Sequence, residues 1–233
     1  MVVWEALIRW NHPERGRIAA DRFIAVAEES RLIIPIGRWV LEEACRQSVA
    51  WQAEGLPPIR VAVNASAVQF SETDFARTVQ EILDKTGLEP RFLEIEITET
   101  VVLKDLEKAC SNLQRLKDMG VTTTLDDFGT GYSSITYLRL MPLDCLKIDK
   151  SFIHDMEIAP GLEDCRNINF VQAFATLARN LNLHLVAEGI ETEAQSRVLK
   201  ELGYTIGQGF LFSVPLSASG AGKLMKVRRE KQR

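Results

Sequence analysis

Short apolar runs alternate with longer segments of helical periodicity along the whole chain. Seven runs rich in apolar and β-branched residues predict strands at residues 2–10, 60–66, 92–98, 121–128, 144–149, 184–189 and 205–212. Apolar residues at helical spacing predict helices at residues 22–30, 35–54, 74–86, 105–119, 168–181 and 193–202. A regular alternation of strands and helices is typical of βαβ units. It therefore predicts an α/β fold with a largely parallel sheet.

A single domain is expected, because no stretch rich in Pro, Gly or Ser divides the chain. We place this domain at residues 1–222 and interpret the strongly basic residues 223–233 as a frayed tail or the start of a linker. The length of 233 residues suits a (β/α)8 barrel, but a closed barrel needs eight strands and the pattern predicts seven. Because the chain opens directly inside a strand, we expect the first barrel strand to be missing from it. Residues 154–167 have the least pattern and are expected to form a functional loop or an interface.

Polar side chains occur where the apolar runs end. One polar residue or pair lies at or near the end of almost every predicted strand: Asn64, Glu96, Asp126 with Asp127, Lys147, Glu188 and Gln208. A carboxylate in a buried strand is expensive unless it is paired or bound to a metal ion. The carboxyl ends of parallel strands meet at one edge, which is where α/β barrels build their active sites. The sequence therefore predicts one polar site at this edge of the sheet.

The donor atoms of this site indicate which metal it would hold. All of the candidate ligands are oxygen donors, with no Cys or His among them: Glu5, Asn64, Glu96, Asp126, Asp127 and Glu188. Such ligands suit Mg²⁺ or Mn²⁺ rather than zinc. Five carboxylates in one place repel one another strongly, so we expect two ions bridged by the adjacent aspartates. Two-metal sites of this kind cleave phosphodiester bonds.

Each of these residues also has a structural interpretation when it is taken alone. The two adjacent aspartates could form a turn or a helix cap. Lys147 could pair with a neighbouring acid, Asp144 or Asp149. Glu94 has the same strand parity as Glu96, so the spacing leaves open which of the two faces the site. We interpret Glu94 as part of a structural ion pair or as an exposed residue.

Charge and cysteine content exclude several other classes. The formal net charge of −4 offers no general attraction to a nucleic-acid polymer or an anionic membrane. The four cysteines form no C-x-x-C pair, which favours reduced thiols and a cytoplasmic location. No apolar run is long enough for a membrane helix, although a longer parent protein could be anchored in a membrane.

Seven segments together resemble the motifs of one family, in the family's order. They are residues 5–10 (EALIRW), 63–66 (VNAS), 93–100 (LEIEITET), 125–134 (LDDFGTGYSS), 146–149 (LKID), 186–192 (VAEGIET) and 207–215 (GQGFLFSVP). The family is that of the EAL domains, the cyclic di-GMP phosphodiesterases of bacteria. The resemblance covers almost the whole chain. It implies a (β/α)8 barrel with an atypical antiparallel first strand.

The resemblance also implies an enzyme that hydrolyses cyclic di-GMP to linear pGpG with Mg²⁺ or Mn²⁺, and that Ca²⁺ inhibits. Glu5, Asn64, Glu96 and Asp126 match the ligands of one ion, and Asp126, Asp127 and Glu188 match those of the other. Glu5, Lys147 and Glu188 take catalytic positions by this comparison, with Lys147 matching a lysine proposed to help activate water.

Further residues match positions around the reacting groups. Leu7, Arg9, Asp149 and Gln208 match substrate-binding positions, and Gln208 with Glu191 also matches residues that position water. The turn after the paired aspartates matches a loop that couples the metal site to a dimer interface in the family. Its residues here, with those that support it, are Thr98, Glu99, Gly129, Thr130 and Gly131.

The chain departs from the family pattern near its start. A strand and a hairpin that usually precede the EAL triplet are absent from the chain, and Trp4 replaces a residue that is typically small.

A catalytically silent EAL domain that acts as a cyclic di-GMP receptor or interaction module is the alternative to an enzyme. An unrelated metal-dependent barrel would lack this motif order. The family also leads us to expect a homodimer, through residues 133–167, and an upstream sensor or diguanylate cyclase domain.

Overall fold

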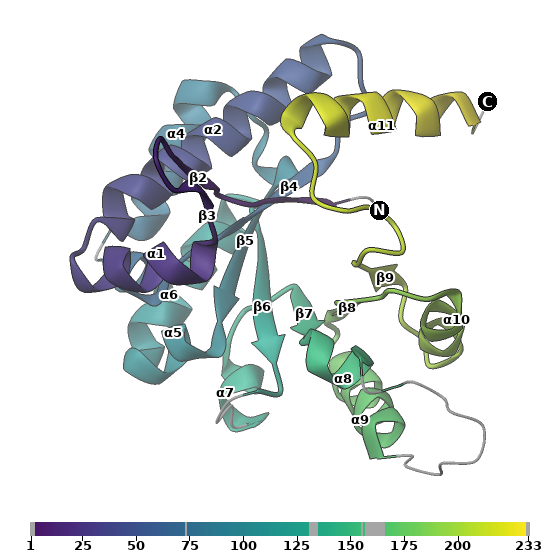
Figure 1. Ribbon diagram of the computed structural model, residues 1–233. Helices are drawn as coiled ribbons and strands as arrows, with labels where there is room; N and C mark the ends of the chain where they lie inside the picture. Colours follow the sequence, from purple (N-terminus) through teal and green to yellow (C-terminus); the bar gives the residue numbers. More distant parts are fainter. Residues whose placement is uncertain (1–2, 73, 131–134, 155, 157–165, 232–233) are drawn as a thin grey trace.

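A parallel sheet of seven strands forms the centre of the molecule (Figure 1). The computed structural model describes residues 3–72, 74–130, 135–154, 156 and 166–231. The strands follow one another in chain order: β1 (Val3–Ala6), β4 (Arg60–Asn64), β5 (Leu93–Thr98), β6 (Thr122–Phe128), β7 (Cys145–Ile148), β8 (His184–Ala187) and β9 (Ile206–Gly207). Each of them lies within one of the seven predicted runs. The predicted α/β class and parallel sheet are confirmed.

Alternation along the strands separates an apolar face from a polar one. Leu93, Ile95 and Ile97 of β5 are fully buried in the core that the sheet shares with the helices. Glu94 and Glu96 lie between them in sequence and therefore point to the opposite, inner face of the curled sheet. The outer face of the sheet thus drives folding, while the inner face is free to carry polar chemistry.

Helices pack against the outer face of the sheet (Figure 1). The six predicted helices are present as α1 (Ala20–Glu29), α2 (Ile33–Ala53), α4 (Phe75–Thr86), α6 (Leu106–Asp118), α9 (Arg166–Asn180) and α10 (Glu193–Glu201). Shorter helices that the pattern did not predict are α3 (Ala67–Phe70), α5 (Glu99–Lys104), α7 (Ile135–Leu140), α8 (Lys150–His154) and a 3₁₀ turn at Pro90–Phe92. Helices of one turn or slightly more are too short to show an apolar period.

The segment after β1 forms a hairpin rather than a longer strand. β2 (Trp10–His12) pairs antiparallel with β3 (Gly16–Ile18), so the run predicted at residues 2–10 ends early. The turn is closed by His12, whose Nδ1 accepts hydrogen bonds from the backbone N–H groups of Glu14 and Arg15 at 3.1 and 3.2 Å. This hairpin is the only antiparallel pairing among the strands that the structure describes.

The basic segment near the carboxyl end is helical. Helix α11 (Ala218–Lys231) buries Ala221 and Met225 against Trp51 and Ile59, at the end of α2 and the start of β4. The boundary expected at residue 222 therefore falls inside a packed helix. The charged residues of this segment hid the amphipathic pattern, because only two of its side chains enter the core.

The sheet curls but has two edges. No pairing among the described strands joins β9 to β1, and every pairing within the seven-stranded sheet is parallel. The arrangement is an open, half-barrel relative of the (β/α)8 barrel. The expected antiparallel strand is not part of this sheet, and residues 133–167, expected at a dimer interface, lie partly outside the described residues. None of the described helices has the length and apolarity needed to cross a bilayer.

Candidate active site

Two amide side chains hold Glu5 from opposite sides. Asn64, the last residue of β4, donates from Nδ2 to Glu5 Oε1 at 2.8 Å. Gln208, directly after β9, donates from Nε2 to Glu5 Oε2 at 2.6 Å. Both carboxylate oxygens of Glu5 are thus oriented, one by the neighbouring strand β4 and the other by the residue after β9, at the opposite edge of the sheet. The Gln208 contact brings together two edge strands that share no backbone pairing among the described strands.

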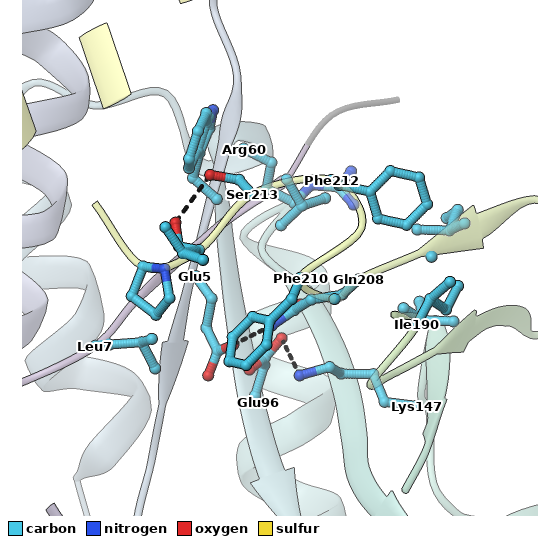
Figure 2. A pocket seen from close by; sticks show the side chains of 18 of the residues that line it. Glu5, Leu7, Arg60, Glu96, Lys147, Ile190, Gln208, Phe210, Phe212 and Ser213 are labelled. Atoms are coloured by element: carbon cyan, nitrogen blue, oxygen red, sulfur yellow. Dashed lines mark hydrogen bonds and ion pairs between the residues drawn. The ribbon is translucent and has the colours of Figure 1, made fainter. Parts of the chain in front are cut away.

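A buried lysine lies among three acidic side chains. The Nζ atom of Lys147 is 2.6 Å from Glu188, 3.1 Å from Glu96 and 3.3 Å from Asp126. The Lys147 side chain is only 2% exposed, and Figure 2 shows it pointing toward Glu96 across the inner face of the sheet. The alternative that Lys147 pairs with Asp144 or Asp149 is therefore wrong.

The paired aspartates and Glu188 form a compact cluster of oxygen atoms. One carboxylate oxygen from each of Asp126, Asp127 and Glu188 lies within 4.8 Å of the others, a spacing that a divalent cation could span. Asp127 has a left-handed backbone with φ 54, and its N–H donates to Asp126 Oδ1 at 2.9 Å. Neighbours in a regular strand point to opposite faces of the sheet. The left-handed turn at Asp127, within an irregularity of the strand register, lets both side chains reach one site.

The acidic groups are electrostatically strained without a cation. Burial raises the pKa of Glu96 well above its usual range, against the attraction of Lys147. Burial, then the charge of Asp126, raises the pKa of Asp127. Burial is also the main reason that the pKa of Glu188 rises to about 7, opposed by Lys147 and supported by Asp126. One lysine does not neutralise this cluster.

The acidic neighbours of Lys147 favour its protonated form. Burial alone would favour its neutral form, but Glu96, Glu188, Asp126 and Glu5 outweigh burial and raise its pKa well above the usual range. The Oε2 atom of Glu96 is buried and has no hydrogen-bond partner within the described part of the chain. A buried carboxylate oxygen without a partner is costly unless a cation contacts it. The oxygen donors and this orphaned atom together fit the expected Mg²⁺ or Mn²⁺ ligation.

A cavity of about 1100 Å³ is lined by Glu5, Glu96 and Lys147 and by residues of both β1 and β9. Of the residues expected to bind substrate, Leu7, Arg9 and Gln208 line this cavity. Figure 2 shows Ile190, Phe210 and Phe212 around it, residues that strand-end reasoning did not single out. Phe210 is 64% exposed, and an exposed aromatic residue within a glycine-containing segment is the signal that could have found it.

The model of a family described as EAL domain matches residues 1–215. The chain belongs to the EAL domain family. MucR of Pseudomonas aeruginosa, named as a bifunctional diguanylate cyclase/cyclic di-GMP phosphodiesterase, is 43% identical over 94% of this chain and 31% of MucR. NbdA of the same organism, named as a cyclic di-GMP phosphodiesterase, is 39% identical over 97% of this chain and 28% of NbdA. The chain thus spans less than a third of the length of these two relatives.

Solved structures of EAL domains have the same architecture. A structure described as the PaMucR phosphodiesterase in a c-di-GMP complex is 43% identical, with a TM-score of 0.86 over 92% of this chain and 85% of that one. The EAL domain of Mycobacterium smegmatis DcpA is 39% identical, with a TM-score of 0.75 over 82% of this chain and 83% of that one. The half-barrel is therefore an EAL-type, TIM-like fold.

Side-chain hydrogen bonds hold the turn that follows the paired aspartates of this EAL domain. Glu99, which is 5% exposed, accepts at Oε1 a hydrogen bond from the N–H of Gly129 at 3.0 Å. Thr130 donates from Oγ1 to the carbonyl of Asp127 at 2.9 Å, and Thr98 Oγ1 lies 2.8 Å from Thr100 Oγ1. Gly131, which was expected in the same loop, lies outside the described residues.

Two expected site residues have local partners instead of contacts with the acidic cluster. Asp149 accepts at Oδ1 from the backbone N–H of Ser151 at 3.0 Å, which organises the start of α8, although its charge also raises the pKa of Asp127. The Glu191 side chain is exposed, and its backbone N–H donates to Gln195 Oε1 at 2.8 Å. Neither residue lines the large cavity.

Glu94 forms the structural ion pair that its parity left open. Its Oε2 atom lies 3.4 Å from Arg60 Nη1, and its Oε1 atom accepts from Thr124 Oγ1 at 2.6 Å. Glu96, two residues further along β5, contacts Lys147 instead. The two acids therefore share the inner face of the sheet but lie at different positions along the strand.

Proposed function

We propose that this EAL domain hydrolyses cyclic di-GMP to linear pGpG with the help of two Mg²⁺ or Mn²⁺ ions. The reaction consumes one water molecule, whose oxygen bonds to phosphorus while the bond from phosphorus to a ribose 3′-oxygen breaks. The observation that carries the proposal is the position of Lys147, whose Nζ atom lies within 3.3 Å of Glu96, Asp126 and Glu188 and which lines one cavity together with Glu5 and Glu96. Asp127 joins Asp126 and Glu188 in a compact cluster of carboxylate oxygens beside it. The names of MucR and NbdA supply the substrate.

The donor set suggests how two ions would be held. Asp126, Asp127 and Glu188 would hold one ion, since their carboxylate oxygens lie close together. Glu5, Asn64, Glu96 and Asp126 would hold the other, with the orphaned Glu96 oxygen as one ligand atom. When bound, such ions lower the pKa of water and stabilise negative charge on phosphate.

The residues themselves contribute orientation and charge. Asn64 and Gln208 orient the Glu5 carboxylate before any ligand arrives, which lowers the entropy lost on binding. Lys147 lies 3.1 Å from Glu96 and 2.6 Å from Glu188, so it would orient both carboxylates and, when protonated, would stabilise developing negative charge. The apolar residues Phe210 and Ile190 at the cavity offer a surface for the guanine bases.

The proposal is tested by incubating the chain with cyclic di-GMP and Mg²⁺, Mn²⁺ or Ca²⁺ and separating the products by chromatography. We expect pGpG with Mg²⁺ or Mn²⁺ and none with Ca²⁺. Glu5→Gln should abolish the product, whereas Glu43→Gln, in an exposed pair with Arg46, should leave it unchanged. Failure of the unaltered chain to form pGpG with either ion, or product formation that ignores Glu5, would overturn the proposal.

The wider setting is also a proposal. MucR is named as carrying a diguanylate cyclase activity as well, and this chain matches only 31% of it. We therefore expect the domain to work beside a sensor or diguanylate cyclase domain and to form a homodimer. Cys45, Cys110 and Cys145 are free thiols, which supports a reducing, cytoplasmic setting.

A further inference from the structure

Three arginines beside the cavity, two on the β2–β3 hairpin and one on α1, have no acidic partner among the described residues. Arg15, Arg17 and Arg22 are exposed, and no ion pair joins any of them to an acid among the described residues. The three arginines differ from other exposed arginines of the chain in that they line one hollow together, and no acidic residue is among the described residues that line it. Unpaired arginines that cluster in one place are available to bind an anion.

These arginines surround a hollow that adjoins the cavity. The hollow is lined by Arg15, Arg17 and Arg22 together with Trp10 and His12, and Arg17 lines the large cavity as well. Figure 1 shows the hairpin lying beside α1, which brings Arg22 next to the other two. We call Arg15, Arg17 and Arg22 the arginine strip. It leads from the outer surface to the mouth of the candidate active site.

The hairpin under the strip is well braced. Trp10 packs edge-on against Phe23 of α1 and against His12, with ring centroids 5.7 Å apart in both pairs. Arg17 lies opposite Asn11 in the ladder, and Gly16 takes the left-handed backbone that the tight turn requires, at φ 67. The strip is thus presented by a fixed backbone.

The charge balance of the cavity leaves a task for such a strip. Five carboxylates roughly offset the charge of two divalent cations and Lys147, so attraction of a substrate with two negative phosphodiesters falls to other cationic residues at the cavity, such as Arg9 and Arg17. The chain as a whole has a net charge of −4, which repels that substrate. Residues 9–22 contain four arginines against two acids, Glu14 and Asp21, and form a local exception.

We propose that the arginine strip binds the phosphodiester anion and guides it to the cavity. Arg17 lines both the hollow and the cavity, so it would contact the anion as it moves from one to the other. This inference rests on the proposed function for its substrate. The arginine strip would raise the association rate and the affinity of the substrate, and the acidic cluster would carry out the chemical step. Electrostatic steering of this kind raises association rates and weakens steeply with salt.

The test compares Arg17→Gln and the triple variant R15Q/R17Q/R22Q with the unaltered chain. We expect kcat/KM for cyclic di-GMP to fall about 3-fold in the single variant and about 10-fold or more in the triple variant at low salt, with kcat unchanged. The difference should shrink at about 0.3 M salt, where charges are strongly screened. Arg17→Lys should retain most of the effect, because it keeps the charge. Arg115→Gln, an exposed change on α6 outside both hollows, is the charge-matched control for the single variant.

Binding supplies a second readout that does not require turnover. Calorimetry with cyclic di-GMP and Ca²⁺ should show weaker, less salt-dependent binding in the triple variant than in the unaltered chain. If the affinity and its salt dependence are unchanged in that variant, the proposed role of the arginine strip is wrong, even if the chain proves active. If the unaltered chain binds but does not hydrolyse, the proposed reaction fails while the binding comparison still decides the strip. Absence of binding by the unaltered chain would overturn both.

Discussion

The Nε2 atom of Gln208 lies 2.6 Å from Glu5 Oε2 and joins the two open edges of the sheet by one side-chain hydrogen bond. No backbone pairing connects β9 to β1 among the described strands. The position of Glu5 therefore depends on a contact between residues 203 positions apart. This makes the Gln208–Glu5 bond a sensitive point of the candidate active site.

Gln208→Ala is expected to lower kcat/KM for cyclic di-GMP about 10-fold, because a hydrogen bond to a charged group contributes about 1.5 kcal/mol or more. The concentration of Mg²⁺ at half-maximal activity should rise as well, since Glu5 keeps only Asn64 as a partner. Steady-state kinetics at varied Mg²⁺ measure both effects. Gln114→Ala, which removes an exposed helical contact with Asp118, should change neither. Equal kinetics in the two variants would show that the bond does not position Glu5.

Lys147→Met should abolish hydrolysis and lower the free energy of unfolding of the metal-free protein by about 3–5 kcal/mol, because it leaves buried carboxylates without their cation. Urea unfolding at neutral pH measures the loss. Added Mg²⁺ should restore part of it, since the ion takes over the neutralisation. Lys117→Met removes an exposed lysine that pairs with the half-buried Asp144, and it should cost less than about 1 kcal/mol. A Lys147 variant as stable as that control would contradict the assignment.

Glu99→Ala is expected to lower activity by disordering the turn that carries Asp127. The variant loses the acceptor for the Gly129 N–H, a bond of 3.0 Å made in a buried position. The expected signature is weaker Mg²⁺ binding together with slower turnover, measured by calorimetry and product formation. Unchanged metal affinity and turnover would rule out this role.

Gly129→Ala should be more damaging than an ordinary glycine substitution. Gly129 has φ 100, and an added Cβ would lie 2.7 Å from the Phe152 ring. We expect a loss of about 2 kcal/mol or more in unfolding free energy, from backbone strain combined with the clash. Gly55→Ala provides the control, because Gly55 has φ 76 but open space around it. Thermal unfolding of the two variants separates the clash from the strain.

The raised pKa of Glu188 predicts how metal binding depends on pH. Below its pKa of about 7, the carboxyl group holds a proton that Mg²⁺ must displace, so apparent Mg²⁺ affinity should rise with pH and level off above pH 7. Calorimetry in buffers of different ionisation enthalpy should detect proton release below pH 7. Glu188→Gln should bind Mg²⁺ more weakly and lose most of this dependence. Retention of the full dependence would assign it to another group.

The same pKa sets the sign of a stability change in the metal-free protein. The unfolded Glu188 carboxyl ionises near 4.5, whereas the folded one keeps its proton until about 7. Between these values the folded state binds more protons, so this group lowers the stability of the folded state as pH rises. Thermal unfolding of the metal-free chain should show that decline, and Glu188→Gln should reduce it.

Much of the fold was readable from the sequence. All seven strands of the parallel sheet and six of the longer helices lie where the apolar period placed them. Buried strands and amphipathic helices have apolar residues at regular intervals, which are visible in the sequence. The β2–β3 hairpin and the short helices left no such signature. Helix α11 was missed because its core contacts, Ala221 and Met225, are few among many charged residues.

The candidate site divides in the same way. Sequence alone determined which oxygen donors end the strands, since the polar break at Asn64, Glu96 or Asp126 is visible along the chain. It did not determine which of them meet. Lys147 contacts Glu188, Glu96 and Asp126 and not its neighbours in sequence, and Glu94 contacts Arg60. The curl and the register of the sheet set these distances. Only the tertiary structure could place Gln208 against Glu5, since that contact depends on the accumulated curvature of seven strands rather than on any local pattern.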